Sequence, residues 1–363
     1  MEILVYSAGS LAIILTVLPF LRYGFWWIRI SEFPRLQIAF VCLLTLISSF
    51  YILSPLIFFE IVFIVALIVC GGYQIYCVLP YLLFYPKQVE KSLAPLAENT
   101  INLLIFNVLI DNRESQKLLD LVMRLKPDVI LLAEPDERWV ADIAELEAHY
   151  PHTVLHPLEN AYGMALYSRL ELVEPHLNFF VEDDIPSIIT QVKLPSGKLI
   201  DFYCLHPRPP VPTESLRSDE RDAELLLVGR IIKETDAPTI IAGDLNDVAW
   251  SRTTKLFQKI SGLLDPRIGR GLYSSFHAHY PIIRFPLDHV FHSNHFRLAK
   301  LERLPNIGSD HFPIHIALTL ETTAEHTQEE PVATPEEERE AVETIVETME
   351  MLEEEKAEEN KNQ

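Results

Sequence analysis

The 363-residue sequence has only four cysteines, and their placement excludes two kinds of small scaffold. Cys42, Cys70 and Cys77 lie in a long apolar region, Cys204 lies far along the chain, and no pair has CxxC spacing. Four scattered cysteines in a chain of this length supply neither a disulfide framework nor a cysteine zinc site. Residues 90–320 are instead long enough to bury a full apolar core.

Basic residues are also scarce, with 30 Lys and Arg against 51 Asp and Glu and a net charge of −21. Residues 321–363 hold 16 Glu against three basic residues and contribute −13, residues 1–89 contribute +1, and residues 90–320 contribute −9. A long nucleic-acid duplex rewards clustered Lys and Arg. The sequence therefore makes no strong case for duplex DNA as a partner.

Ionisable residues are almost absent from three apolar runs, which cover residues 3–20, 36–59 and 61–85. The first run has about the length of a bilayer crossing, and it is no convincing secretory signal because its flank has no Lys or Arg. Pro55 and Glu60 separate the second and third runs near a tight turn. No large soluble domain is present to cover buried core helices, so we predict an all-α transmembrane region of three helices over residues 1–89.

Basic residues beside the apolar runs predict the orientation in the membrane. Arg22, Arg29 and Arg35 lie in the first loop, the second loop has no basic residue, and Lys87 and Lys91 follow the third run. Basic loops stay in the cytoplasm. We expect a multi-pass membrane protein whose amino terminus lies outside and whose domain after residue 90 lies in the cytoplasm.

Residues 90–320 alternate short apolar strands with amphipathic helices. Predicted strands cover residues 101–108, 129–133, 153–155, 164–167, 188–194, 199–205, 239–242, 287–291, 298–304 and 314–320. Predicted helices cover residues 114–126, 138–149, 218–233 and 253–260. This mixed order predicts an α/β domain in which two sheets pack face to face with helices outside.

Residues 321–363 form a Glu-rich tail, for which disorder is the expectation from the charge and the lack of aromatic residues. Val342, Ile345, Met349 and Leu352 have helical spacing, so a short amphipathic helix remains an alternative.

Polar residues stand at or beside the ends of several predicted strands, where an α/β scaffold places its functional site. They are Asn107, Glu134, His206, Asp244, Asn246, Asp310 and His311. Each alone has a plain structural interpretation, such as a turn cap for Asn107 or a solvated loop carboxylate for Glu134. Their ordered combination supplies carboxylates, carboxamides and an imidazole, which can hold a divalent cation and activate water for attack on a phosphate ester.

The set Asn107, Glu134, His206, Gly243-Asp244-Leu245-Asn246, Asp288-His289-Val290 and Ser309-Asp310-His311 resembles the endonuclease/exonuclease/phosphatase superfamily over residues 100–320. The apolar region and the stretch from His206 to Pro210 resemble its membrane-bound bacterial branch. The resemblance implies a four-layer α/β sandwich and a phosphoesterase that uses Mg²⁺ or Mn²⁺. Phe276 departs from the pattern, because the family often has Trp before the strand that carries Asp288.

The resemblance also implies roles for the residues. Glu134 and Asp310 would be metal ligands with Asn107 nearby, which suits the preference of Mg²⁺ for oxygen ligands. His311 would be the general base, oriented by Asp288. Further roles are implied at three positions: Asp244 and Asn246 would position water and phosphate or assist the leaving group, and His206 would contact a phosphate oxygen.

Alternatives remain open from the sequence. A zinc site is conceivable in the cluster His277, His279, His289, His292 and His295, but no HExxH-like spacing supports it. A non-catalytic membrane scaffold would keep the fold without the chemistry. For an enzyme, the substrate could be a lipid phosphodiester, a small phosphate ester or a nucleic-acid end, with the lipid bilayer as the other partner.

Overall fold

The computed structural model describes residues 1–53 and 57–362. The chain forms two compact units, which are treated separately below. The helical unit contains Met1–Pro86, Pro210–Ser218 and Gly269–Gly271. The α/β unit contains Lys87–Pro209, Asp219–Ile268 and Leu272–Gln363.

The helical unit contains three long helices and one short one: α1 (Glu2–Val17), α2 (Trp26–Arg29), α3 (Arg35–Ile52) and α4 (Phe58–Val78). With short 3-10 extensions, Glu2–Leu21, Arg35–Ile52 and Phe58–Tyr81 are each long and apolar enough to cross a membrane. Glu60 lies in the first turn of α4. The predicted turn near Pro55 lies outside the described residues.

Buried polar groups of the helical unit are paired with one another. Arg35 donates to Glu32 at 2.9 Å and to Gln74 at 3.2 Å, and the Gln74 amide donates to Thr16 at 2.9 Å. These contacts connect α1, α3 and α4 through side chains that would be costly to leave unpaired in an apolar medium.

The α/β unit has two mixed sheets. The first has the order β10-β11-β1-β2-β4-β3, with β1 (Thr100–Asn107), β2 (Val129–Ala133), β3 (His152–His156), β4 (Met164–Ser168), β10 (Phe296–Arg303) and β11 (Ile314–Leu320). The second has the order β5-β6-β7-β8-β9, with β5 (Glu171–Asn178), β6 (Ser187–Lys193), β7 (Leu199–Cys204), β8 (Thr239–Asp244) and β9 (Asp288–His292).

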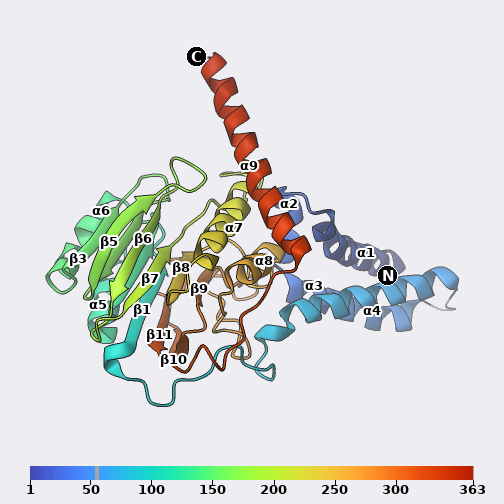
Figure 1. Ribbon diagram of the computed structural model, residues 1–363. Helices are drawn as coiled ribbons and strands as arrows, with labels where there is room; N and C mark the ends of the chain where they lie inside the picture. Colours follow the sequence, from blue (N-terminus) through green and yellow to red (C-terminus); the bar gives the residue numbers. More distant parts are fainter. Residues whose placement is uncertain (54–56, 363) are drawn as a thin grey trace. The chain divides into compact units, whose positions relative to one another are not determined.

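Four layers result, as predicted (Figure 1). The sheets pack on each other through residues such as Leu103, Leu131, Phe202 and Ile240, which are all buried. The first sheet is covered by α5 (Ser115–Leu125) and α6 (Glu137–Asp142), and the second by α7 (Asp219–Lys233) and α8 (Arg252–Ser261). The single helix expected over residues 138–149 is instead α6 followed by a 3-10 helix, Ala144–Ala148.

Strand pairing explains why polar residues distant in sequence converge. β1 and β2 run parallel, as do β7 and β8, so the carboxyl ends of each pair lie at the same edge. β9 is antiparallel to β8 and begins with Asp288 opposite Asp244. β11 is antiparallel to β1 and pairs Ile314 with Ile105, so the residues just before β11 lie near the end of β1.

The expectation of a disordered tail is wrong for much of its length, because Pro335–Asn362 forms helix α9. Ala341 and Ile345 of α9 pack against Leu226, Leu256 and Ile260 of α7 and α8. Ion pairs add to this contact, including Lys259 with Glu337 at 2.5 Å and Lys233 with Glu338. Apolar positions at helical spacing therefore outweigh the charge density that favours disorder.

Candidate active site

Asp244 stands at the centre of the site and is held by a tight turn. The preceding Gly243 has a φ of 147°, and a Cβ there would lie 1.9 Å from the carbonyl oxygen of Leu205, so only glycine fits. The Asp244 carboxylate accepts a hydrogen bond from the backbone of Asn246 at 3.0 Å, and Asn246 has a left-handed φ of 51°. The turn fixes a buried carboxylate at the end of β8.

Asn107 connects Asp244 to Glu134. Its Nδ2 donates to Glu134 Oε1 at 2.7 Å and to Asp244 Oδ2 at 3.0 Å. Its Oδ1 accepts from the backbone of Leu109 at 3.0 Å, which fixes the orientation of the amide. The contact joins the two sheets, because Asn107 ends β1 and Glu134 follows β2 in the first sheet, whereas Asp244 ends β8 in the second.

His311 extends this series on the other side of Asp244. Its Nδ1 lies 2.7 Å from Asp288 Oδ2, and its Nε2 lies 3.4 Å from Asp244 Oδ2. The hydroxyl of Ser309 donates to the carbonyl of Asn107 at 2.8 Å and accepts from the His311 backbone at 2.9 Å. Glu134, Asn107, Asp244, His311 and Asp288 thus form one continuous series, called the polar chain below.

Burial and charge shift the pKa values of the polar chain. Burial raises the pKa of Glu134 to about 7, against the hydrogen bond from Asn107 and the charge of His311, and nearby Asp244 and Asp310 raise it further. Burial also raises the pKa of Asp288. For His311, burial opposes the charged form, but Asp288 and Asp244 outweigh it and raise its pKa to about 10.

His206 and Asn246 lie beside the polar chain. His206 is buried, its Nδ1 has no hydrogen-bond partner in the described part of the chain, and burial lowers its pKa. A neutral imidazole with an unused ring nitrogen is therefore available beside Asp244. The Asn246 side chain donates to the carbonyl of Pro207 at 2.9 Å, so part of its amide holds the loop after β7.

Asp310 is half-buried beside Ser309, whose hydroxyl lies 3.4 Å from its carboxylate. Its carbonyl accepts a hydrogen bond from Ala278 at 2.6 Å. Its negative charge raises the pKa values of both Glu134 and His311, so the Asp310 carboxylate influences two members of the polar chain.

Potential metal-ligand atoms of Asp244, Asp288 and His311 lie within 4.8 Å of one another. The contacts from His311 to both aspartates account for this proximity without an ion. The residues predicted to hold a cation are Glu134 and Asp310, with Asn107 nearby, and their carboxylate and amide oxygens are hard donors. The negative charge of Asp310 raises the pKa of Glu134. Two such carboxylates fit a hard divalent cation such as Mg²⁺ or Mn²⁺.

The histidine cluster considered for zinc does not form a metal centre in the described ranges, where no group of three or more candidate ligands includes one of its members. His289 is fully buried, with its Nε2 2.9 Å from the carbonyl of Asp247 and its Nδ1 2.7 Å from Arg267. His292 contacts the carbonyl of Ser293.

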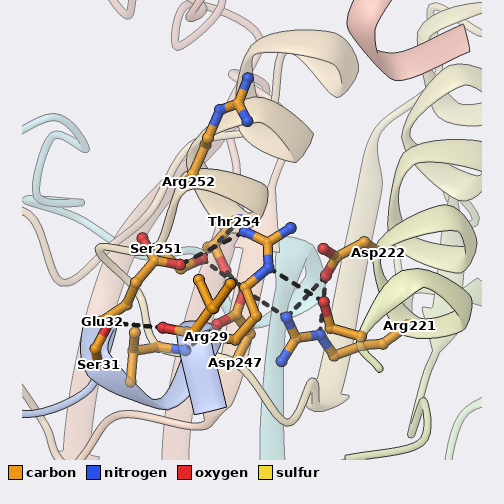
Figure 2. Close-up of polar contacts among 12 residues, drawn as sticks. Arg29, Ser31, Glu32, Arg221, Asp222, Asp247, Ser251, Arg252 and Thr254 are labelled. Atoms are coloured by element: carbon orange, nitrogen blue, oxygen red, sulfur yellow. Dashed lines mark hydrogen bonds and ion pairs between the residues drawn. The ribbon is translucent and has the colours of Figure 1, made fainter. Parts of the chain in front are cut away.

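A buried charged network behind the turn was not foreseen (Figure 2). Arg221 of α7 donates to the carbonyl of Asn246 at 2.6 Å and to Asp222 at 2.7 Å. Asp247 accepts from Ser251 at 2.5 Å and from Thr254 at 3.3 Å. The network supports the backbone of the Asp244 turn, but Arg221 on an amphipathic helix looks like a solvated residue in the sequence.

Known structures share this fold. The humanized TDP2 from D. rerio is 17% identical and aligns with a TM-score of 0.50 over 61% of this chain and 99% of that one. The endonuclease/exonuclease/phosphatase from Bacteroides vulgatus is 16% identical, with a TM-score of 0.50 and the same coverage of 61% and 99%. No curated protein matches the sequence.

These likenesses show a shared two-sheet α/β fold. The family model described as Endonuclease/Exonuclease/phosphatase family matches residues 104–311, more than half of the sequence, so the chain belongs to this family. Its members are nucleases and phosphatases, which hydrolyse phosphate esters and generally use divalent metals.

Proposed function

We propose that the chain is a membrane-anchored phosphoesterase that depends on Mg²⁺ or Mn²⁺ and hydrolyses a phosphodiester or phosphomonoester. The polar chain carries this proposal. It brings the carboxylates of Glu134 and Asp244 and a carboxylate-oriented histidine to one point between the sheets, and Asp310 directly precedes that histidine. A scaffold without activity would have no need to keep five buried or half-buried polar residues in mutual contact.

Glu134 and Asp310 would hold the cation, with Asn107 beside them. A bound Mg²⁺ or Mn²⁺ supplies positive charge that offsets the negative charge of the phosphoryl group during reaction. Asn107 donates hydrogen bonds to both Glu134 and Asp244, which offsets part of the repulsion between these carboxylates.

His311 would take the proton from the attacking water. In neutral His311, a proton on Nδ1 would be donated to Asp288, and Nε2 would be the acceptor. Asp244, at 3.4 Å from Nε2, would orient the water and stabilise the imidazolium that forms. Asn246 would contact the phosphate or assist the leaving group, and neutral His206 would donate a hydrogen bond to a phosphate oxygen.

The test of this function is hydrolysis by the purified full chain in detergent micelles. We expect cleavage of bis(p-nitrophenyl) phosphate or p-nitrophenyl phosphate with added Mg²⁺ or Mn²⁺, loss of cleavage in EDTA, and recovery when excess Mg²⁺ is returned. Turnover that is unchanged by EDTA would contradict the cation, and recovery by Zn²⁺ alone would contradict its assignment as Mg²⁺ or Mn²⁺. A screen over phospholipids, inositol phosphates and oligonucleotides would then identify the substrate class.

We further propose that the three apolar helices each cross the membrane and that the α/β unit lies in the cytoplasm. The support comes from Arg22 and Arg29 between α1 and α3, from Arg35 at the start of α3, and from Lys87 and Lys91 after α4. A cytoplasm-active reporter fused after Gln363 should work, and one active only outside the cytoplasm should stay silent. The reverse pattern would mean that fewer segments cross and that the site faces the exterior.

A further inference from the structure

A loop beside the active site exposes a cluster of large apolar side chains. Tyr280, Ile282 and Ile283 are 58%, 79% and 53% exposed. The loop is ordered by hydrogen bonds of 3.1 Å from His277 to the carbonyl of Ile283 and from Ile283 to that of Tyr280. We call residues 279–284 the apolar loop. Because these hydrogen bonds fold the loop into a turn, its apolar side chains are held exposed. Exposed apolar patches of this kind mark interaction surfaces.

The apolar loop is attached to the catalytic residues. The backbone of Ala278, just before it, donates to the carbonyl of Asp310 at 2.6 Å. The ring of Phe276 lies 5.0 Å from the ring of His311. A ligand that binds to the apolar loop would therefore lie close to His311.

Two guanidinium groups lie at the base of the apolar loop without a counter-charge. Arg284 and Arg303 both stack on the ring of Phe312, at 5.0 and 4.2 Å, and Phe312 directly follows His311. Arg284 donates to the carbonyl of Ala278 and Arg303 to that of Ser274. Over residues 1–53 and 57–362, neither guanidinium forms an ion pair with a carboxylate.

The like charges of this pair disfavour each other. Burial lowers the pKa of Arg303, and the charge of Arg284 lowers it further. Residues 90–320 carry a net charge of −9, so these two neighbouring arginines are a local concentration of positive charge in an acidic segment. An anion between them would relieve the repulsion, and a phosphate suits the planar guanidinium geometry.

Exposed apolar side chains next to a pair of arginines match the surface of an anionic bilayer, where acyl chains lie next to headgroup phosphates. The chain also leads to the membrane here. Gly269–Gly271, shortly before the apolar loop, belongs to the helical unit, and Gly269 donates to the carbonyl of Pro80 at 2.8 Å. Pro80 lies within Phe58–Tyr81, the third segment able to cross a membrane.

We propose that the apolar loop and Arg303 form a lipid-contact surface. Tyr280, Ile282 and Ile283 enter the boundary between headgroups and acyl chains, while Arg284 and Arg303 bind the headgroup phosphate of an anionic phospholipid. The surface adjoins His311, so it would present a lipid phosphoester to the site. Lipid contact does not depend on the proposed function, and only the presentation of a substrate rests on it.

The experiment uses the full chain in nanodiscs with an environment-sensitive fluorophore on Ile282→Cys. All four native cysteines are buried, so the new thiol is labelled selectively. A label on Lys198→Cys, in the exposed turn before β7 and therefore at the opposite end of that strand from His206, is the matched control. Discs of phosphatidylcholine alone are compared with discs that contain increasing phosphatidylglycerol.

We expect a blue shift at position 282 that grows with phosphatidylglycerol, and no shift at position 198. Arg284→Gln with Arg303→Gln should raise the phosphatidylglycerol fraction for half-maximal shift severalfold, whereas Arg124→Gln, at the far end of α5, should not. Thermal unfolding checks that the double variant is folded.

Three results would overturn the proposal. One is an equal response in both kinds of disc, and another is an unchanged response in the folded double variant. The third is a shift produced in phosphatidylcholine discs by soluble glycerol phosphate or by an oligonucleotide, which would identify a soluble anion as the ligand. None of these readouts needs hydrolysis, so they remain informative if the proposed catalytic function fails.

Discussion

His311→Gln should lower turnover of a phosphodiester by about 10²- to 10⁴-fold, the usual contribution of a positioned general base. Glutamine keeps a polar side chain of similar length but cannot take a proton from water. Steady-state hydrolysis by the purified protein measures the effect. The control is His326→Gln, since the side chain of His326 is 75% exposed, and its turnover should match that of the wild type. Equal turnover in both variants would remove His311 from the mechanism.

The pH dependence should report the same group. Only neutral His311 can act as a base, so the rate should rise with pH on the acid side of the profile. Asp288 and Asp244 raise the pKa of His311 to about 10, and bound positive charge near Glu134 would lower it. Asp288→Asn removes one of the raising charges, so its acid limb should move to lower pH while its maximal rate falls. A limb that stays in place would assign the titration to another group.

Glu134→Gln should abolish binding of Mg²⁺ or Mn²⁺ at the site and lower turnover by roughly 10³-fold, equivalent to about 4 kcal/mol. Glutamine preserves the hydrogen bond that Glu134 accepts from Asn107 at 2.7 Å but removes the charge that would bind the cation. Isothermal titration with Mn²⁺ measures binding separately from activity.

The exposed Glu137, three residues further along, provides the matched control. Glu137→Gln removes the same charge from the same segment and should retain both Mn²⁺ binding and turnover. If Glu134→Gln binds Mn²⁺ as the wild type does, the cation lies elsewhere, and the group of Asp244, Asp288 and His311 becomes the next candidate.

The layers and strand ends could be predicted because they depend on local patterns. Apolar strands such as β2 and β8 are buried throughout, so each reads as a short continuous apolar run that ends at a polar residue. Parallel pairing then places those ends together. β5 was missed because it lies at the edge of its sheet, is largely exposed, and has a register shift between Val173 and His176.

Contacts between distant segments could not be predicted. The pairing of Asn107 with Asp244, 137 positions apart, and the stacking of Arg284 and Arg303 on one ring both depend on how sheets and loops meet. Arg221, which supports the Asn246 carbonyl, also reads as a surface residue until α7 is placed on its sheet. Residue types at strand ends are enough to predict the chemistry of the site. Tertiary packing determines which of these groups form hydrogen bonds or lie close enough to shift one another's pKa.

The pairing of β1 with β11 determines when activity can first appear during synthesis. Thr100 and Thr319 are partners 219 positions apart, and the polar chain takes Asn107 from the first strand and His311 from just before the last. A ribosome releases the three apolar helices and Glu134 long before His311. A nascent chain that has released Glu134 but not His311 therefore lacks part of the polar chain, and its site is incomplete. Slow closure of this long-range pair would delay completion of the site until β11 has been synthesised.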